Sequence, residues 1–121
     1  MLAGNPKIIS VVFYAAAGGG EPVRDWLLKL DKADRSTIGI EIKTVEYGWP
    51  LGMPLVRAMV GYDRLWEVRI SLSGNRIARV MFTVHNNRMI LLHGFIKKSK
   101  TTPNADLVLA DKRKRDIQRG N

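Results

Sequence analysis

Residues 65–96 read LWEVRISLSGNRIARVMFTVHNNRMILLHGFI, and their pattern decides the fold. Apolar and polar residues alternate along 65–70 and 76–84, the period of two that is typical of strands with one covered face. The segment 89–96 is apolar on both faces, which predicts an interior strand. Short polar turns separate these three segments, so we expect them to pair as antiparallel neighbours in a meander.

The residues before the meander predict one strand and then a helical hairpin. Residues 7–14 (KIISVVFY) are β-branched and aromatic, as strand residues often are. Residues 22–30 begin with proline and carry apolar side chains at helical spacing, which predicts a helix. A second helix begins at Asp31 or Asp34 and stops at Gly48.

A last helix follows the meander and ends near Arg119. Thr102 as N-cap, Pro103 at the first position and Asp106 in the first turn predict its start. Its expected buried residues are Leu107, Ala110 and Ile117. The element order β-α-α-β-β-β-α predicts one α+β domain over residues 1–121, with a small twisted, mainly antiparallel sheet.

Composition narrows the kinds of protein that this chain can be. The 121 residues contain no cysteine and two histidines, so we expect neither a disulfide scaffold nor a metal or cofactor site. No apolar run of about 18 residues is present, and the first residues lack a signal-peptide pattern, so we expect a cytoplasmic protein without a membrane partner. Lys and Arg total 20 and Asp and Glu total 11, which gives a net charge of +9. This charge favours a polyanionic partner over general solubility alone.

Charged residues within the strands indicate where a polyanion would bind. Glu67, Arg69 and Arg79 alternate with apolar residues along their strands. Their side chains therefore face the side of the sheet opposite to the apolar side chains. The last strand ends in a cluster of ammonium groups: Lys97, Lys98 and Lys100. If the helical hairpin covers the apolar face, the other face is open and cationic, and it would attract a phosphate backbone.

Cleavage of RNA needs little more than such a surface. The 2′-hydroxyl attacks the adjacent phosphorus, fixed cations stabilise the growing negative charge, and a general base and a general acid transfer protons. Lysine, histidine or glutamate can serve without a metal if neighbouring groups shift their pKa values. The same surface suits a non-catalytic module that binds nucleic acid or an acidic protein. The residues alone leave these alternatives open.

Several candidate residues can instead have a role in the fold alone, which we call the structural interpretation. Glu67 and Arg69 can form ion pairs that only stabilise the sheet. His93 lies in the most apolar strand and can be a buried, hydrogen-bonded imidazole. Lys97 and Lys98 alternate at a strand end, so only one of them need face a site.

The segments LWEVRI (65–70), RIARVMF (76–82) and ILLHGFIKKSKTTPNADLVLA (90–110) together resemble the RelE/HigB-like toxin superfamily, and most closely its phage-derived branch. The most specific part is HGFIKKSKTTP (93–103). The resemblance implies a RelE-like fold and the toxin of a type II toxin–antitoxin pair. Such a toxin is a metal-independent endoribonuclease that cuts mRNA on translating ribosomes. The resemblance also implies a helix-turn-helix antitoxin, encoded by the adjacent gene, as partner.

The resemblance also implies roles for individual residues. By position, Arg69 and Arg79 would bind the scissile phosphate, and Lys97 and Lys98 would supply charge and acid–base function. Further expected members of the catalytic set are Glu67 and His93, and the expected RNA-binding residues are Arg57, Lys100 and Arg76. Related sequences often carry tyrosine where this chain has Phe82, which alternation places in the core.

Overall fold

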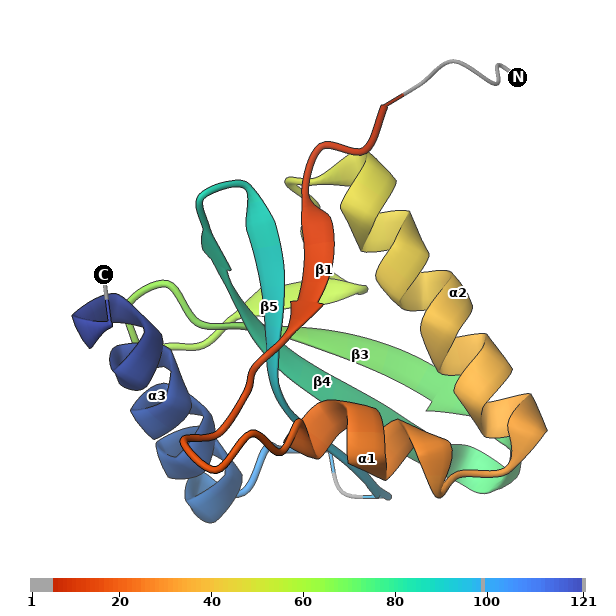
Figure 1. The fold of residues 1–121 in the computed structure, drawn as a ribbon. Helices are drawn as coiled ribbons and strands as arrows, with labels where there is room; N and C mark the ends of the chain where they lie inside the picture. The colour runs from red at the N-terminus through yellow and green to blue at the C-terminus, as the bar shows by residue number, and fades with distance from the viewer. Residues whose placement is uncertain (1–5, 99, 121) are drawn as a thin grey trace.

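A computed structural model describes residues 6–98 and 100–120, and over these residues it shows an α+β fold with a five-stranded mixed sheet and three α-helices (Figure 1). Along the chain the elements are β1 (Ser10–Phe13), α1 (Pro22–Leu28), α2 (Lys32–Gly48), β2 (Val56–Ala58), β3 (Trp66–Leu72), β4 (Arg76–His85), β5 (Arg88–Lys97) and α3 (Asn104–Arg119). A single turn of 3-10 helix, Ser73–Asn75, joins β3 to β4. The strand order in the sheet is β1-β5-β4-β3-β2.

The predicted meander is confirmed, because β3, β4 and β5 pair as antiparallel neighbours. The predicted order lacked one element, the three-residue strand β2, which pairs with β3. Strand β1 runs parallel to β5, which makes the sheet mixed. Strand β5 therefore lies inside the sheet, between β1 and β4, as its apolar sequence predicts.

The helix boundaries follow the sequence signals closely at the hairpin and less closely at the last helix. Helix α2 begins directly after Asp31 and ends at Gly48. Helix α3 begins one residue later than expected, with Pro103 rather than Thr102 in the cap position. The prediction of Thr102 as the N-cap is therefore wrong, and its hydroxyl has another partner, described below.

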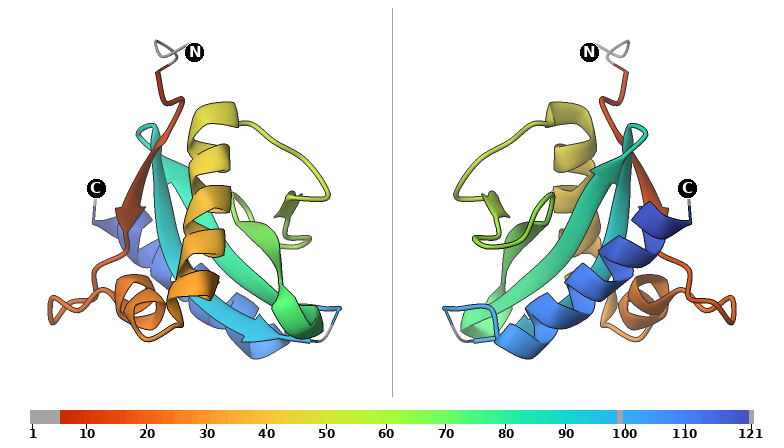
Figure 2. Two further views of the ribbon diagram at one scale, coloured as in Figure 1. Left: turned by 90° about the vertical axis from the view of Figure 1, so that its right-hand side faces the viewer. Right: turned by 90° about the vertical axis from the view of Figure 1, so that its left-hand side faces the viewer.

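Helices α1 and α2 cover one face of the sheet, called here the front face (Figure 2). The strands contribute Val68, Ile70, Val80 and Phe82, which are buried against α2 residues such as Ile38 and Val45. Phe82 has no exposed surface, so its predicted place in the core is confirmed. The alternation of residues along β3 and β4 thus sends one set of apolar side chains under the helical hairpin.

A glycine in β5 lets α1 approach the sheet closely. A Cβ atom at Gly94 would lie 2.4 Å from Cζ3 of Trp26 on α1, much closer than carbon atoms can approach. The indole ring therefore occupies the space above Gly94 and packs on the front-face core. This contact fixes α1 against the interior strand of the sheet.

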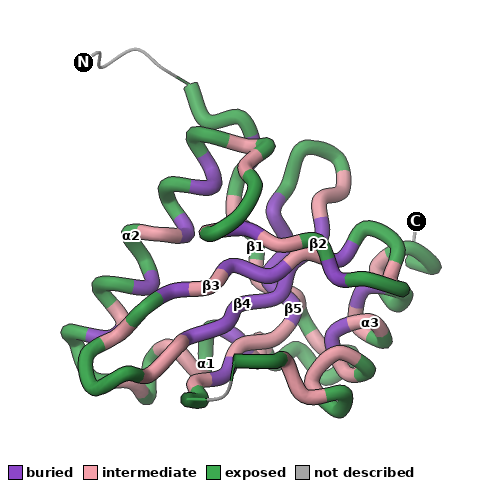
Figure 3. Tube along the Cα trace, turned by 180° about the vertical axis from the view of Figure 1, so that it is seen from behind, coloured by how far each residue is buried: buried purple, intermediate pink, exposed green. Residues whose placement is uncertain are grey.

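Helix α3 packs against β4 and β5 on the opposite face, called here the back face (Figure 3). The second core beneath it contains these residues: Met59, Leu65, Met81, Ile90, Leu92, Phe95 and Ala110. Leu107 and Ile117 pack against this core, so the predicted buried side of α3 is confirmed. The expectation that the back face is open is wrong, because α3 and the connection that precedes it cover part of that face.

Candidate functional site

The back face carries a cluster of charged side chains around Glu67. The sheet register places Arg57 on β2 opposite Glu67, and Arg69 on β3 opposite Arg79 on β4. Residues that face each other across neighbouring strands point to the same side of a sheet, so these three arginines converge. Oε1 of Glu67 lies 3.7 Å from Nε of Arg79 and 4.0 Å from Nε of Arg69.

Two members of this cluster are buried. Glu67 and Arg79 have no exposed surface, and the Arg79 guanidinium lies 6.0 Å from the ring centroid of Phe95. Burial lowers the pKa of Arg79 below its usual range; Glu67 opposes this shift, and the charges of Arg69 and Arg57 add to it. Both side chains lie beneath the surface in this arrangement, and their catalytic role stays a prediction. Glu67 forms an ion pair with Arg79 and also contacts Arg69, the partner that the structural interpretation named.

The connection between β5 and α3 closes over this cluster. The hydroxyl of Thr102 donates a hydrogen bond to Oε2 of Glu67. This hydroxyl was expected to cap α3, and it binds Glu67 instead. In the same connection, the carbonyl oxygen of Lys100 accepts a hydrogen bond from Nη2 of Arg69 at 3.5 Å. The two contacts tie the connection to β3 and bring Lys100 next to Arg69.

Next to this cluster, a histidine and an aspartate join β5 to α3. Nε2 of His93 lies 2.6 Å from Oδ1 of Asp106 in the first turn of α3. Nζ of Lys97 lies 3.6 Å from the other carboxylate oxygen of Asp106. The side chains of His93 and Asp106 are 17% and 16% exposed, so both reach the surface although they are mostly covered. An imidazole held by a carboxylate is an arrangement suited to proton transfer.

The exposed basic residues beside this pair form what we call the cationic rim: Arg69, Lys97, Lys98 and Lys100. Arg69 is 26% exposed at its side chain and Lys97 is 47% exposed, while Lys98 and Lys100 are also exposed. Arg69 contacts the Lys100 backbone, and Lys97 contacts Asp106. Lys98 is placed only by its position directly after β5. Among the basic residues predicted at the end of the last strand, Lys97 is the one with a contact to the His93–Asp106 pair in the described part of the chain.

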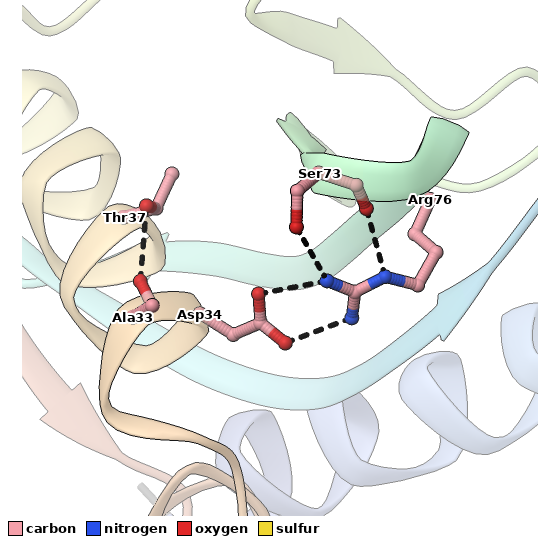
Figure 4. A network of polar contacts seen from close by, with 5 residues as sticks. All are labelled: Ala33, Asp34, Thr37, Ser73 and Arg76. Carbon is pink, nitrogen blue, oxygen red and sulfur yellow. Dashed lines mark hydrogen bonds and ion pairs between the residues drawn. The ribbon is translucent and has the colours of Figure 1, made fainter.

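Arg76 lies apart from this group. Its Nη1 and Nη2 donate to the two carboxylate oxygens of Asp34 on α2, at 2.8 and 3.0 Å, and its Nε donates to the carbonyl of Ser73 at 2.9 Å (Figure 4). The hydrogen bonds from Arg76 hold the pKa of Asp34 below its usual range. The Arg76 guanidinium thus ties the β3–β4 turn to α2 beside the front face, and its expected RNA contact stays a prediction.

The chain matches one known protein family. The family model described as "Phage derived protein Gp49-like (DUF891)" matches residues 25–115, which is more than half of the chain. The chain belongs to this Gp49-like family. A comparison with curated proteins found no match. In the Gp49-like protein the matched range runs from α1 into α3, so it contains the charged cluster, the cationic rim and the His93–Asp106 pair.

Sequence reasoning missed two residues of the site in the Gp49-like protein. The sequence pattern near Pro103 assigned both Asp106 and Thr102 to the start of α3, and for Thr102 that assignment is wrong. Asp106 contacts a residue 13 positions away and Thr102 a residue 35 positions away, so no local spacing reveals either contact.

Two further findings concern the described residues alone. Within residues 6–98 and 100–120, no group of three or more histidine, aspartate or glutamate side chains could hold a metal ion. Over the same ranges, no helix has the length and apolar character needed to cross a membrane.

Proposed function

We propose that this Gp49-like protein is the toxin of a type II toxin–antitoxin pair and cuts mRNA on translating ribosomes. The observation that carries the proposal is the His93–Asp106 pair, held at 2.6 Å and bordered by the cationic rim. The net charge of +9 agrees with a protein that acts on a polyanion. Membership of the phage-derived Gp49-like family agrees with a toxin-like protein.

In this proposal the RNA backbone lies along the cationic rim. Arg69, Lys97 and Lys100 provide positive charge to a phosphate group, and Arg69 can do so with its guanidinium fork. The 2′-oxygen attacks the adjacent phosphorus, and the bond from phosphorus to the 5′-oxygen breaks. The products are a 2′,3′-cyclic phosphate and a free 5′-hydroxyl, so one proton leaves the 2′-oxygen and one joins the 5′-oxygen.

His93 is our candidate for one of these two proton transfers. Histidine is the side chain that enzymes use most often as a general acid or base. Lys97, beside it on Asp106, stabilises the negative charge that develops on the phosphoryl oxygens. Glu67 and Arg79 support this surface from beneath, because their buried ion pair holds Arg69 and Thr102 in place.

The test is induced expression of the gene alone in a bacterium. We expect growth arrest and new mRNA 5′ ends, mapped by primer extension, and we expect both to be lost in His93→Gln. Arg24→Ala, an exposed change on α1, is the control that should stay toxic. Normal growth with intact mRNA at good expression would contradict the proposal. RNA binding that weakens with salt but gives no cleavage would favour the alternative, a non-catalytic basic module.

The proposal includes a protein partner. We expect a helix-turn-helix antitoxin, encoded by the adjacent gene, to bind this protein and to suppress its effect on growth. Co-expression of the two genes, followed by purification through a tag on one of them, tests this expectation. Rescued growth with a stable complex would support it, and continued arrest without a complex would contradict it.

A further inference from the structure

A small pocket lies at the end of the back face, where β2, the connection between β5 and α3, and α3 meet. It has a volume of about 230 Å³ and is lined by Arg57, Met59, Val60, Thr101, Thr102 and Leu107. The lining combines polar or cationic residues, Arg57, Thr101 and Thr102, with the aliphatic and thioether side chains of Met59, Val60 and Leu107. Pockets for drug-sized ligands measure roughly 300–1,000 Å³, so this one suits a single small ring system.

We infer that this pocket takes one nucleobase of the RNA substrate, and that Arg57 reads the edge of that base. The inference rests on the proposed function. An arginine can donate two parallel hydrogen bonds to O6 and N7 of guanine, the commonest specific contact between an arginine and a base. The pocket therefore favours guanine among the four bases.

The charges around the pocket support an acceptor-rich ligand. Arg57 is the register partner of Glu67 across β2 and β3, and its charge acts on the Arg79 guanidinium. The Glu67 carboxylate itself contacts Arg79 and Arg69. Within residues 6–98 and 100–120, Arg57 itself has no salt bridge or side-chain hydrogen bond. Its donors are thus available to oxygen and nitrogen acceptors of a ligand.

The residues that line the pocket suit a nucleobase better than a phosphate group. Met59, Val60 and Leu107 offer no hydrogen bonds to phosphoryl oxygens, and removing an anion from water against such groups costs free energy. The flat face of a base is apolar and can lie against these side chains, while its edge meets Arg57. A nucleobase therefore suits both kinds of lining residue, whereas a phosphate suits only one.

The sheet register relates the pocket to the proposed centre of reaction. Arg57, Glu67, Met81 and His93 are successive partners across four strands. Neighbouring strands lie about 4.8 Å apart, so the backbones of Arg57 and His93 are separated by roughly 14 Å. Arg69 of the cationic rim lies on β3 two residues from this row, and its guanidinium contacts the carbonyl oxygen of Lys100. The pocket would therefore read a nucleotide that flanks the cut.

Mapping of cleavage sites tests this inference. RNA 5′ ends are mapped across a transcript pool after induction of the wild type, Arg57→Ala, Arg57→Gln and the control Lys112→Ala, an exposed change on α3. We expect the wild type and the control to prefer guanine at one flanking position by roughly 5- to 150-fold, and Arg57→Ala to lose this preference. Arg57→Gln should shift it towards adenine. An unchanged base preference in Arg57→Ala would overturn the inference.

A binding experiment separates this inference from the proposed function. The methyl resonances of Met59 and Val60 are followed by NMR while guanosine monophosphate or ribose 5-phosphate is added to the purified protein. We expect the nucleotide to shift them and the base-free compound to leave them in place, whether or not the protein cuts RNA. Equal shifts with both compounds, or none with either, would overturn the inference.

Discussion

Nε2 of His93 on β5 and Oδ1 of Asp106 on α3 lie 2.6 Å apart, and this contact joins the sheet to its last helix. The second oxygen of the same carboxylate faces Nζ of Lys97 at 3.6 Å. Both oxygens of Asp106 thus have basic partners, which fixes the carboxylate and, through it, the imidazole ring. An imidazole held in one orientation transfers a proton along one direction, so Asp106 acts as a positioning residue in the proposed reaction.

Replacing this carboxylate should slow RNA cleavage without unfolding the domain. Asp106→Asn keeps the shape of the side chain but removes the charge that orients His93. Because general acid–base catalysis contributes about 10²- to 10⁴-fold, we expect a loss of that order in His93→Gln and a smaller loss in Asp106→Asn. The cleavage rate of a defined RNA as a function of pH is the measurement, with Asp25→Asn on α1 as control. A wild-type rate and pH profile in Asp106→Asn would exclude the positioning role.

The buried charges should affect stability much more than exposed ones. Glu67→Ala leaves the Arg79 guanidinium buried without its carboxylate, and breaking a buried pair in this way costs about 3–5 kcal/mol. Urea denaturation of the purified protein measures this loss in the free energy of unfolding. Glu21→Ala, which removes an exposed pair with Arg24, is the matched control and should cost at most about 1 kcal/mol. Equal costs would show that the Glu67 cluster is hydrated in solution.

The sequence predicted those parts of the fold that local spacing determines. The three strands of the meander follow the period of two, and α2 begins and ends at the signals expected for it. The short strand β2 was missed, because three residues are too few to show alternation. The parallel pairing of β1 with β5 was also missed, since it joins segments far apart in the chain.

The candidate site was predicted less completely, for a physical reason. Alternation correctly places Arg69 and Arg79 on one face, but it says nothing about what covers that face. Helix α3 packs there, and Thr102 reaches Glu67, so that Arg79 becomes fully buried. The contact of Asp106 with His93 depends on the same packing, which only the tertiary structure reveals.

Replacing either of two glycines by alanine should change the stability of the protein, in opposite directions for the two positions. Gly94→Ala would place a Cβ atom within 2.4–2.9 Å of three atoms of the Trp26 ring, and overpacking of this kind costs about 1–3 kcal/mol. Gly39→Ala, within α2, meets nothing within 4 Å and should stabilise the helix by about 0.5–1 kcal/mol. Thermal and urea denaturation measure both changes. A neutral Gly94→Ala would contradict the close approach of α1 to β5.

The Asp34–Arg76 pair should make stability depend on pH in the acidic range. Arg76 holds the pKa of Asp34 below its usual range in the folded protein, so the folded state favours the ionised carboxylate. The resulting stabilisation is complete above the unfolded pKa and is lost as the pH falls through the folded pKa. We therefore expect Asp34→Asn to be less stable than the wild type at about pH 6, and the difference to disappear in stronger acid. Urea midpoints of both proteins across this range provide the measurement. When Arg76 is also replaced by alanine, Asp34→Asn should no longer change how stability depends on pH. If the change persists in the Arg76→Ala protein, another partner of Asp34 causes it.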